Sequence, residues 1–302
     1  MVSRARILAA LLVVIVLAGC QVPRPPGPEP LRYRDTVFSA ATVTSNLVYG
    51  SAPDGAGNPV TLTLDVYRPA GDSQTKRPAL VWVHGGSFRS GSKTDFVPTD
   101  VANTFARLGY VVVSINYRLL APNTCIANPG QAACITAAIE AQHDAQAAVR
   151  WLRANAGTYG VDPTRVAIGG ESAGGITATL VGLRRDDPGT SGNPGPSSTV
   201  GGFVSVSGGV PSGAFVDSGD SPGLLFHGTA DRTVSPSWSR DTADALLRAH
   251  VPFSYQVQEG AGHVPWGQYR TLYLTQSNYF LYQQLDLAHA AGQPQSATAR
   301  RR

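Results

Sequence analysis

The residues with the most specific chemical potential form the run GESAG at 170–174, with Ser172 at its centre. A serine between small residues is typical of a nucleophile elbow, a sharp strained turn that tolerates only small neighbours. The pattern alone is weak, because a chain with 33 glycines contains such spacings by chance. Its context favours the interpretation, since an apolar run at 165–168 precedes it and helical spacing at 176–183 follows. We therefore predict that Ser172 is a nucleophile.

A serine hydroxyl is a poor nucleophile without a base and a third group that orients the base. His263 lies in a Gly-rich loop just after an apolar run at 253–257, a suitable mount for a catalytic imidazole. Asp231 follows the run at 224–226 in the same way and is the expected acid. We interpret His227 as a structural hydrogen-bonding residue beside this acid rather than as a catalytic group.

Acyl transfer at a serine also requires backbone donors for the oxyanion. Gly85 and Gly86 follow an apolar run at 79–83 and carry no side chain that would block a substrate oxygen. With the amide of Ala173 they form a predicted oxyanion hole. The alternative is an ordinary tight turn after a strand, the usual role of a glycine pair.

These residues follow elements that alternate along the chain. Strands are expected at 60–67, 79–83, 110–115, 165–168, 203–206, 224–226 and 253–257, and helices at 101–108, 137–154, 176–183 and 241–250. Such alternation predicts an α/β fold with a mostly parallel central sheet and helices on both faces. The loops at the carboxyl ends of the strands then converge on one crevice, and each of the motifs above falls on such a loop.

The motifs VHGG at 83–86, NYRL at 116–119 and GESAGG at 170–175 resemble the serine carboxylesterase/lipase branch of the α/β-hydrolase fold. Within that branch the likeness is greatest to compact bacterial esterases of the feruloyl-esterase-like and hormone-sensitive-lipase-like kind. The acid and base loops, HGTAD at 227–231 and Gly262-His263, match as well, and the resemblance spans about residues 45–285.

Transferred position by position, the resemblance implies Ser172 as nucleophile, Asp231 as acid and His263 as base. Gly85, Gly86 and Ala173 then provide the oxyanion hole. Ser87 stands where many relatives have a third glycine, so the sequence leaves open which amide at 85–87 is the second donor. The resemblance implies a serine carboxylic ester hydrolase that needs no cofactor, and no metal site is readable.

The expected substrates are short-chain or aryl esters, or exposed ester linkages in a polymer. The short stretch between Val206 and Leu224, where larger relatives carry a lid, implies a small or absent cap. Four aromatic residues that flank the motif loops are expected to line the pocket: Phe88, Tyr117, Trp238 and Trp266. A serine exopeptidase of the same fold and a non-catalytic binding module remain as alternatives.

Glu171, beside the nucleophile, is expected either to pair with Arg118 beneath the site or to face substrate, and we favour the structural pairing. Cys125 and Cys134 lie in one loop and are expected to form a disulfide in an oxidising compartment. Two free thiols or a metal pair are the alternatives, but no further His or Cys lies close to them in the chain.

Residues 1–19 have the pattern of a secretory signal, with two arginines before about twelve apolar residues. The ending LAGC, with Cys20 last, resembles the lipobox of bacterial lipoproteins. This resemblance implies a protein exported to the cell envelope and anchored to its membrane through a lipid on Cys20. The alternative is an ordinary secreted protein with an incidental cysteine.

The remaining boundaries follow from composition. The proline-rich composition of residues 20–30 predicts a lipid-anchored, semi-rigid spacer. Residues 31–287 are expected to form a catalytic domain and 288–302 a disordered basic tail.

Five arginines near the chain ends account for more than the whole net charge of +4, so no basic stripe remains for nucleic acid. A multi-span membrane protein is excluded by a mean hydropathy of −0.06. The oligomeric state is not predictable from these features.

Overall fold

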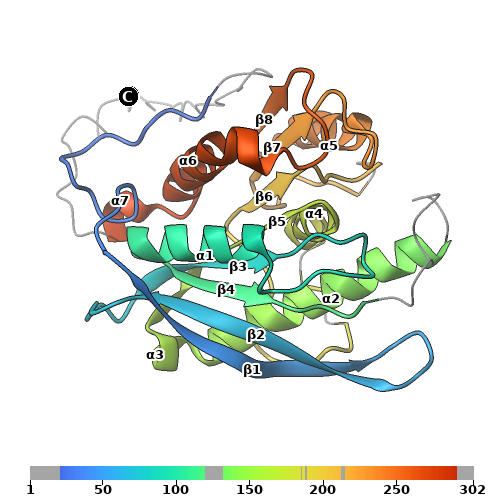
Figure 1. Cartoon of the computed structure of the whole chain (residues 1–302), viewed down its shortest axis with the longest axis horizontal. Helices are drawn as coiled ribbons and strands as arrows, with labels where there is room; N and C mark the ends of the chain where they lie inside the picture. The colour runs from blue at the N-terminus through green and yellow to red at the C-terminus, as the bar shows by residue number, and fades with distance from the viewer. Residues whose placement is uncertain (1–20, 120–131, 185, 188, 212–214, 291–302) are drawn as a thin grey trace, which may run out of the picture.

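The computed structural model describes residues 21–119, 132–184, 186–187, 189–211 and 215–290. One eight-stranded sheet organises them, with the strand order β1-β2-β4-β3-β5-β6-β7-β8 (Figure 1). The strands are β1 Ala41–Pro53, β2 Pro59–Pro69, β3 Arg77–Val83, β4 Val111–Ile115, β5 Val161–Glu171, β6 Phe203–Val206, β7 Gly223–Gly228 and β8 Phe253–Gln258. Strands β3 to β8 are parallel to one another, whereas β1 and β2 pair antiparallel with their neighbours.

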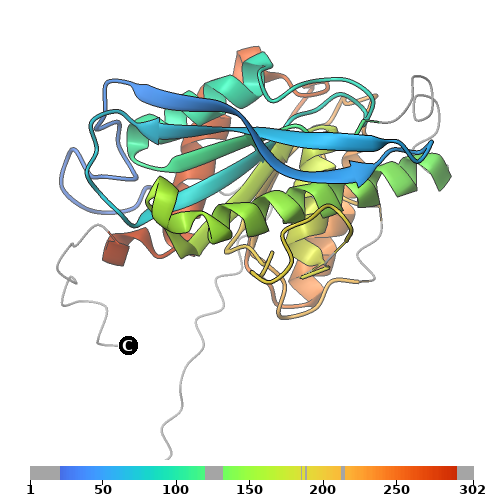
Figure 2. The ribbon, with the colours of Figure 1, turned by 90° about the horizontal axis from the view of Figure 1, so that it is seen from below.

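Helices cover both faces of the sheet and bury its two sides in separate apolar clusters. The helices are α1 Phe96–Leu108, α2 Ala132–Ala154, α3 Ala156–Tyr159, α4 Ala173–Leu183, α5 Pro236–Arg248, α6 Trp266–Gln284 and α7 Leu287–Ala290. One cluster joins α2, α4 and α5 to one face, and the other joins α1 and α6 to the opposite face. Figure 2 shows α2 running along one face of the sheet. The predicted α/β architecture with a mostly parallel sheet is confirmed.

Each strand and helix expected from the sequence is present, but two long elements were not expected. Strand β1 is exposed at most positions and has two register irregularities, so its apolar pattern is broken. Helix α6 buries polar side chains such as Gln276, Ser277 and Asn278 beside its aromatic ones. Since apolar periodicity is the main sequence signal for a helix, a helix with buried amides shows little of it.

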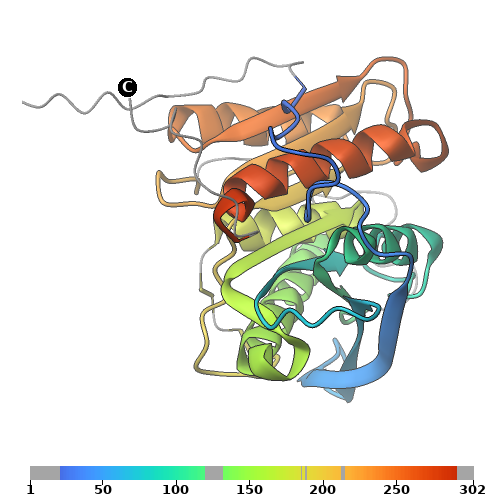
Figure 3. The ribbon, with the colours of Figure 1, turned by 90° about the vertical axis from the view of Figure 1, so that its left-hand side faces the viewer.

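The proline-rich segment does not form the expected spacer. Figure 3 shows the start of the described chain, in dark blue, crossing α6. Val22 is buried, its N–H donates to Gln276 Oε1 at 2.5 Å, and Gln283 Nε2 donates to the Pro23 carbonyl at 3.1 Å. Because prolines leave carbonyls without matching N–H groups, side-chain amides on a neighbouring helix can hold such a segment in place. Residues 21–30 therefore belong to the folded unit.

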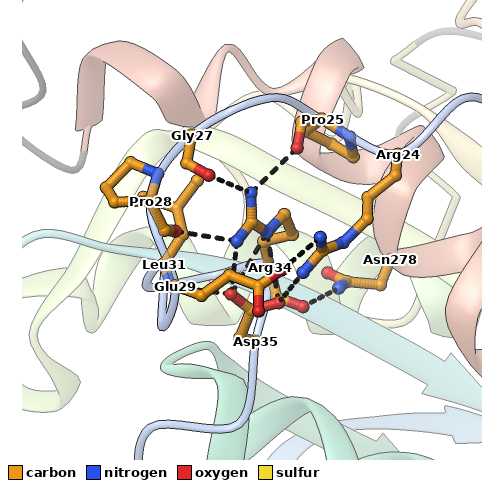
Figure 4. Close-up of polar contacts among 9 residues, drawn as sticks. All are labelled: Arg24, Pro25, Gly27, Pro28, Glu29, Leu31, Arg34, Asp35 and Asn278. Atoms are coloured by element: carbon orange, nitrogen blue, oxygen red, sulfur yellow. Dashed lines mark hydrogen bonds and ion pairs between the residues drawn. The ribbon is translucent and has the colours of Figure 1, made fainter.

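Arg34 also holds the proline-rich segment in place, through hydrogen bonds from its guanidinium group. Figure 4 shows its guanidinium at the centre of a ring of carbonyls from Pro25, Gly27 and Pro28, at 2.8–3.1 Å. The adjacent Asp35 supplies the counter-charge at 2.6 Å. Planar guanidinium donors suit this arrangement, because several N–H groups can each meet a separate oxygen.

Two further sequence expectations concern the chain between elements and its end. Helix α7 extends to Ala290, so residues 288–290 are helical where the sequence predicted disorder, and 291–302 lie outside the described residues. Between β6 and β7, the described residues form no helix or strand. None of the described helices combines the length and the apolar character that crossing a membrane requires.

Candidate active site

The nucleophile candidate lies at the turn from β5 into α4. Ser172 has φ 54° and ψ −121°, a conformation that is rare and costly for a residue other than glycine. Its N–H donates to the Val206 carbonyl on β6 at 2.8 Å, which fixes the turn to the sheet. A Cβ on Gly174 would lie 1.9 Å from the Val83 carbonyl oxygen. Only glycine fits there, so the small residues of the run are required by close approach to β3.

Ser172, His263 and Asp231 form one hydrogen-bonded chain. The His263 Nε2 atom lies 2.8 Å from Ser172 Oγ, and its Nδ1 lies 2.8 Å from Asp231 Oδ2. Because a carboxylate accepts, Nδ1 carries the proton in the neutral ring, and Nε2 is left to accept from the serine hydroxyl. The three side chains come from loops after β5, β7 and β8, and Ser172 is 8% exposed. The arrangement can deprotonate the hydroxyl and hold the resulting imidazolium.

The carboxylate of Asp231 is held ionised by its surroundings. Burial alone would raise its pKa, but hydrogen bonds from His227, His263 and the N–H groups of Thr233 and Val234 together lower it well below the usual value. His227 is 1% exposed, and its Nε2 lies 3.2 Å from Asp231 Oδ2. It lies 3.1 Å from the Val234 carbonyl as well. His227 thus contacts the acid and not the serine, as the structural interpretation requires.

The loop after β3 corrects one predicted oxyanion donor. The N–H of Gly85 donates to Glu171 Oε1 at 2.9 Å, so it is engaged with a side chain instead of a substrate oxygen. A Cβ on Gly85 would lie 3.2 Å from the Ser172 Cβ. Gly85 therefore lies close to the serine, and its amide is not the second donor in this arrangement.

Gly86 fits the donor role instead. No hydrogen bond from the Gly86 N–H occurs among the residues that the structure describes, nor does one from the Ala173 N–H at the start of α4. Ala173 follows Ser172 in the chain, and Gly86 follows Gly85, which packs against Ser172. A helix N-terminus such as that of α4 also favours negative charge. Gly86 has φ 116°, and a Cβ there would lie 2.0 Å from the Ser90 carbonyl oxygen. Position 86 therefore admits no side chain.

Glu171 does not pair with Arg118, so that expectation is wrong. Arg118 contacts Asp144 at 3.0 Å and lies 3.9 Å from Glu140, both on α2. Glu171 is 6% exposed, and its second oxygen accepts from the Trp82 indole N–H at 2.7 Å. Burial raises the pKa of Glu171 to about 8, although the two N–H donors oppose that shift.

A cavity of about 400 Å³ adjoins the oxyanion loop. Its lining residues are Gly85, Gly86, Ser90, Gly91, Asp95, Phe96, Val97, Pro98 and Glu171. Phe96, the first residue of α1, is 69% exposed at the edge of this cavity. It is not among the aromatic residues predicted from the sequence to line the pocket. An exposed phenylalanine shortly after the glycine motif was the available signal, but exposure is not readable from sequence. Neither this cavity nor a second one of about 490 Å³ beside Arg150 is lined by Ser172, Asp231 or His263.

The four aromatic residues predicted to line the pocket line neither of these cavities. Phe88, Tyr117 and Trp266 are each at most 5% exposed and belong to the two apolar cores. Trp238 is partly buried and packs against one of those cores. Large aromatic side chains next to a site gain more by burial in the core than by exposure in a pocket.

Of the three cysteines predicted to form a disulfide or to carry a lipid, the structure describes one. Cys134 is buried at the start of α2, whereas Cys125 and Cys20 lie outside the described residues. The pairing of Cys125 with Cys134 therefore stays a prediction. Among the described residues, no group of three or more His, Cys, Asp or Glu side chains is arranged to hold a metal ion.

Comparison with known proteins adds a family match and named relatives. Residues 64–199 match the BD-FAE family model. Esterase cest-33 of Caenorhabditis elegans is 32% identical over 141 residues, which are 43% of this chain and 23% of that protein. Phenmedipham hydrolase of Pseudarthrobacter oxydans is 38% identical over 115 residues, 37% of this chain and 21% of that protein. The chain thus spans less than a quarter of the length of these two curated relatives.

Among solved structures, esterase 2 of Thermogutta terrifontis phosphorylated by paraoxon is 25% identical with a TM-score of 0.64, covering 82% of this chain and 95% of that one. The chain has the α/β-hydrolase fold. The propionate-bound form of the same esterase is 26% identical with a TM-score of 0.63, covering 88% of this chain and all of that one. In this α/β-hydrolase fold, Ser172, His263 and Asp231 lie at the carboxyl ends of the parallel strands, where such sheets bind ligands.

Proposed function

We propose that the chain is a serine carboxylic ester hydrolase that works through a Ser172–His263–Asp231 triad and an acyl-enzyme intermediate. The observation that carries the proposal is the pair of 2.8 Å contacts that His263 makes, one to Ser172 and one to Asp231. The names of the relatives, which include an esterase and a phenmedipham hydrolase, support hydrolysis as the class of reaction.

In this mechanism Ser172 Oγ attacks the ester carbonyl as His263 Nε2 takes its proton. The N–H groups of Gly86 and Ala173 stabilise the oxyanion, and Asp231 stabilises the imidazolium. His263 then protonates the leaving alcohol, and an acyl-Ser172 ester remains. Water, deprotonated by the same histidine, hydrolyses that ester and regenerates the serine.

The proposed substrates are esters with short acyl groups or aryl alcohols. Three features support this choice: the absence of a helix or strand among the described residues between β6 and β7, the modest cavity beside Gly86, and the exposed Phe96 at its edge. Thermogutta terrifontis esterase 2 binds propionate and is phosphorylated by paraoxon, an aryl phosphate ester, according to its structures. A similar small pocket here would accept acetyl and butyryl groups.

Hydrolysis of p-nitrophenyl acetate, butyrate and octanoate by the chain from residue 21 onward tests the proposal, beside the Ser172→Ala variant. We expect turnover to fall from butyrate to octanoate and the variant to lose at least about 10⁴-fold in kcat, since removal of a triad serine leaves only the oxyanion hole and binding. A folded wild-type protein without turnover would contradict the proposal. Equal turnover of octanoate would contradict only the small pocket.

We also propose, from the sequence pattern, that the protein is exported and carries a lipid on Cys20. Because Val22 is held against Gln276, an anchor at Cys20 would leave the domain close to the membrane surface instead of on a spacer. Partition of the full-length protein, expressed in a bacterium, between detergent and aqueous phases tests this. Recovery in the aqueous phase alone would contradict the lipid.

A further inference from the structure

Glu171 is a buried carboxyl group that the proposed mechanism does not use. It lies next to Ser172 in the chain, and both of its oxygens accept hydrogen bonds from neutral N–H donors, one from Trp82 and one from Gly85. No arginine, lysine or histidine pairs with it among the described residues. A buried carboxyl without a counter-charge costs stability, so Glu171 is a candidate for a role other than stabilising the fold.

The bond to Gly85 orients a particular peptide plane. In the His84–Gly85 peptide, the N–H donates to Glu171 and the carbonyl lies 3.2 Å from the Tyr117 hydroxyl. The next plane, Gly85–Gly86, has its carbonyl 2.6 Å from His84 Nδ1 and 3.4 Å from the same hydroxyl. Because a trans peptide is planar, holding its carbonyl oxygen fixes the opposite direction of its N–H. The N–H left over is that of Gly86.

The loop beyond this point needs such restraint. Gly86, Ser87 and Phe88 have φ values of 116°, 56° and 61°, three successive residues in a conformation that costs free energy for the latter two. A strained loop of this kind keeps its shape only when its surroundings hold it. Phe88 is buried against Tyr117 on one side, and Glu171 holds Gly85 on the other.

We propose that Glu171 is a positioning residue that orients the Gly86 N–H toward the oxyanion, acting through Gly85 and together with Tyr117. This inference rests on the proposed esterase function. It links the residue before the nucleophile to the donor loop, so the serine and its oxyanion donor move as one unit. Glu171 acts through the Gly86 N–H, and its effect belongs to the transition state more than to substrate binding.

The first test is Glu171→Gln, which keeps the shape of the side chain but replaces one acceptor oxygen with an NH₂ group. One of the two N–H donors then faces another donor. We expect kcat for p-nitrophenyl acetate to fall about tenfold to a hundredfold, less than loss of a whole oxyanion donor, with KM within about twofold. Affinity for a trifluoromethyl ketone, which forms a tetrahedral adduct with an active serine, should fall by the same factor as kcat.

Tyr117→Phe provides a second route if Glu171→Gln folds poorly, because it removes only the hydroxyl that holds the two carbonyls. It should lower kcat in the same sense, and the double variant should lose less than the product of the two single effects, since both act on one N–H. Asp162→Asn is the matched control: it neutralises a buried carboxylate at the other end of β5 and should leave kcat unchanged.

The outcomes separate the inference from the function on which it rests. Wild-type turnover with unchanged kcat in both folded variants would overturn the inference alone, and so would a loss confined to KM. A lower melting temperature without a change in kcat or in ketone affinity would assign Glu171 a merely structural role and overturn it as well. Absence of wild-type turnover and of ketone binding would overturn the function and the inference together.

Discussion

The two ends of β5 each carry a buried carboxyl group, but the groups are satisfied in opposite ways. Asp162, at the start, accepts from Thr164 N–H at 2.9 Å and pairs with Arg165 at 2.5 Å. Glu171, at the end, accepts from the neutral N–H groups of Trp82 and Gly85 and pairs with no cation among the described residues. Burial tends to raise both pKa values. Hydrogen bonds and the guanidinium reverse that tendency at Asp162 and lower its pKa, whereas the pKa of Glu171 is raised to about 8.

The difference shows how one strand separates stability from chemistry. A carboxylate with a full set of partners, one of them a cation, fastens the turn that begins β5 and adds to the free energy of unfolding. A carboxyl group without a cation costs stability, but it can hold one backbone N–H in a defined direction. Such costly groups concentrate at functional ends of elements, and this one lies beside Ser172.

The largest expected effect, a loss of kcat, comes from replacing a glycine near Glu171 with alanine. The matched replacement is at a glycine near Asp162. Gly86→Ala should lower kcat at least about a hundredfold, because its Cβ would meet the Ser90 carbonyl at 2.0 Å and displace the donor N–H. Gly160→Ala, just before β5, has φ 66° and should cost about 1–3 kcal/mol of stability while kcat is unchanged. Steady-state kinetics and urea unfolding of both variants measure this. Equal losses of kcat in the two variants would contradict the distinction between a functional and a structural end of β5.

The next effect concerns pH, with opposite signs at the two ends. Glu171 has a folded pKa of about 8 against an ordinary 4.5, so the folded state holds its proton more tightly. Wild-type stability should therefore fall, relative to Glu171→Gln, as pH rises from about 4.5 to 8. Asp162 has a lowered pKa, so its contribution relative to Asp162→Asn is present above its ordinary 3.8 and is lost as pH falls below that value.

Urea unfolding of the wild type and the two variants between pH 3 and pH 9 checks both signs. Because each variant keeps every other titratable group, the difference from wild type isolates one carboxyl group. A wild-type advantage that grows with pH at Glu171 would show that its two N–H bonds outweigh burial. That result would make the two ends alike in this respect.

The smallest effect is expected from Arg165→Lys. Lysine keeps the positive charge beside Asp162 but cannot also donate to the Leu285 carbonyl as Arg165 Nε does at 3.0 Å. We expect a loss of at most about 1 kcal/mol in the free energy of unfolding, with kcat unchanged. A larger loss, measured in the same urea titration, would mean that the start of β5 depends on the bond to the end of α6 more than on the ion pair.

Local patterns predicted most of the scaffold. Continuous apolar runs gave away the buried parallel strands, and the small residues around Ser172 indicated a turn that admits no larger side chain. Local patterns did not predict the elements whose exposure or burial depends on residues far away in the chain. Strand β1 is largely exposed, and α6 buries Gln276 because its side chain accepts from the Val22 N–H in the N-terminal segment.

The sequence by itself determined the alternation of strands and helices between β2 and β8 and the candidate residues Ser172, Asp231 and His263, because periodicity and turn chemistry depend on near neighbours in the chain. Only the tertiary structure decided that Arg118 pairs with Asp144, that Glu171 holds Gly85, and that the Gly86 N–H is left available. A hydrogen-bond partner is chosen by distance and burial, and the residues concerned lie far apart in the chain.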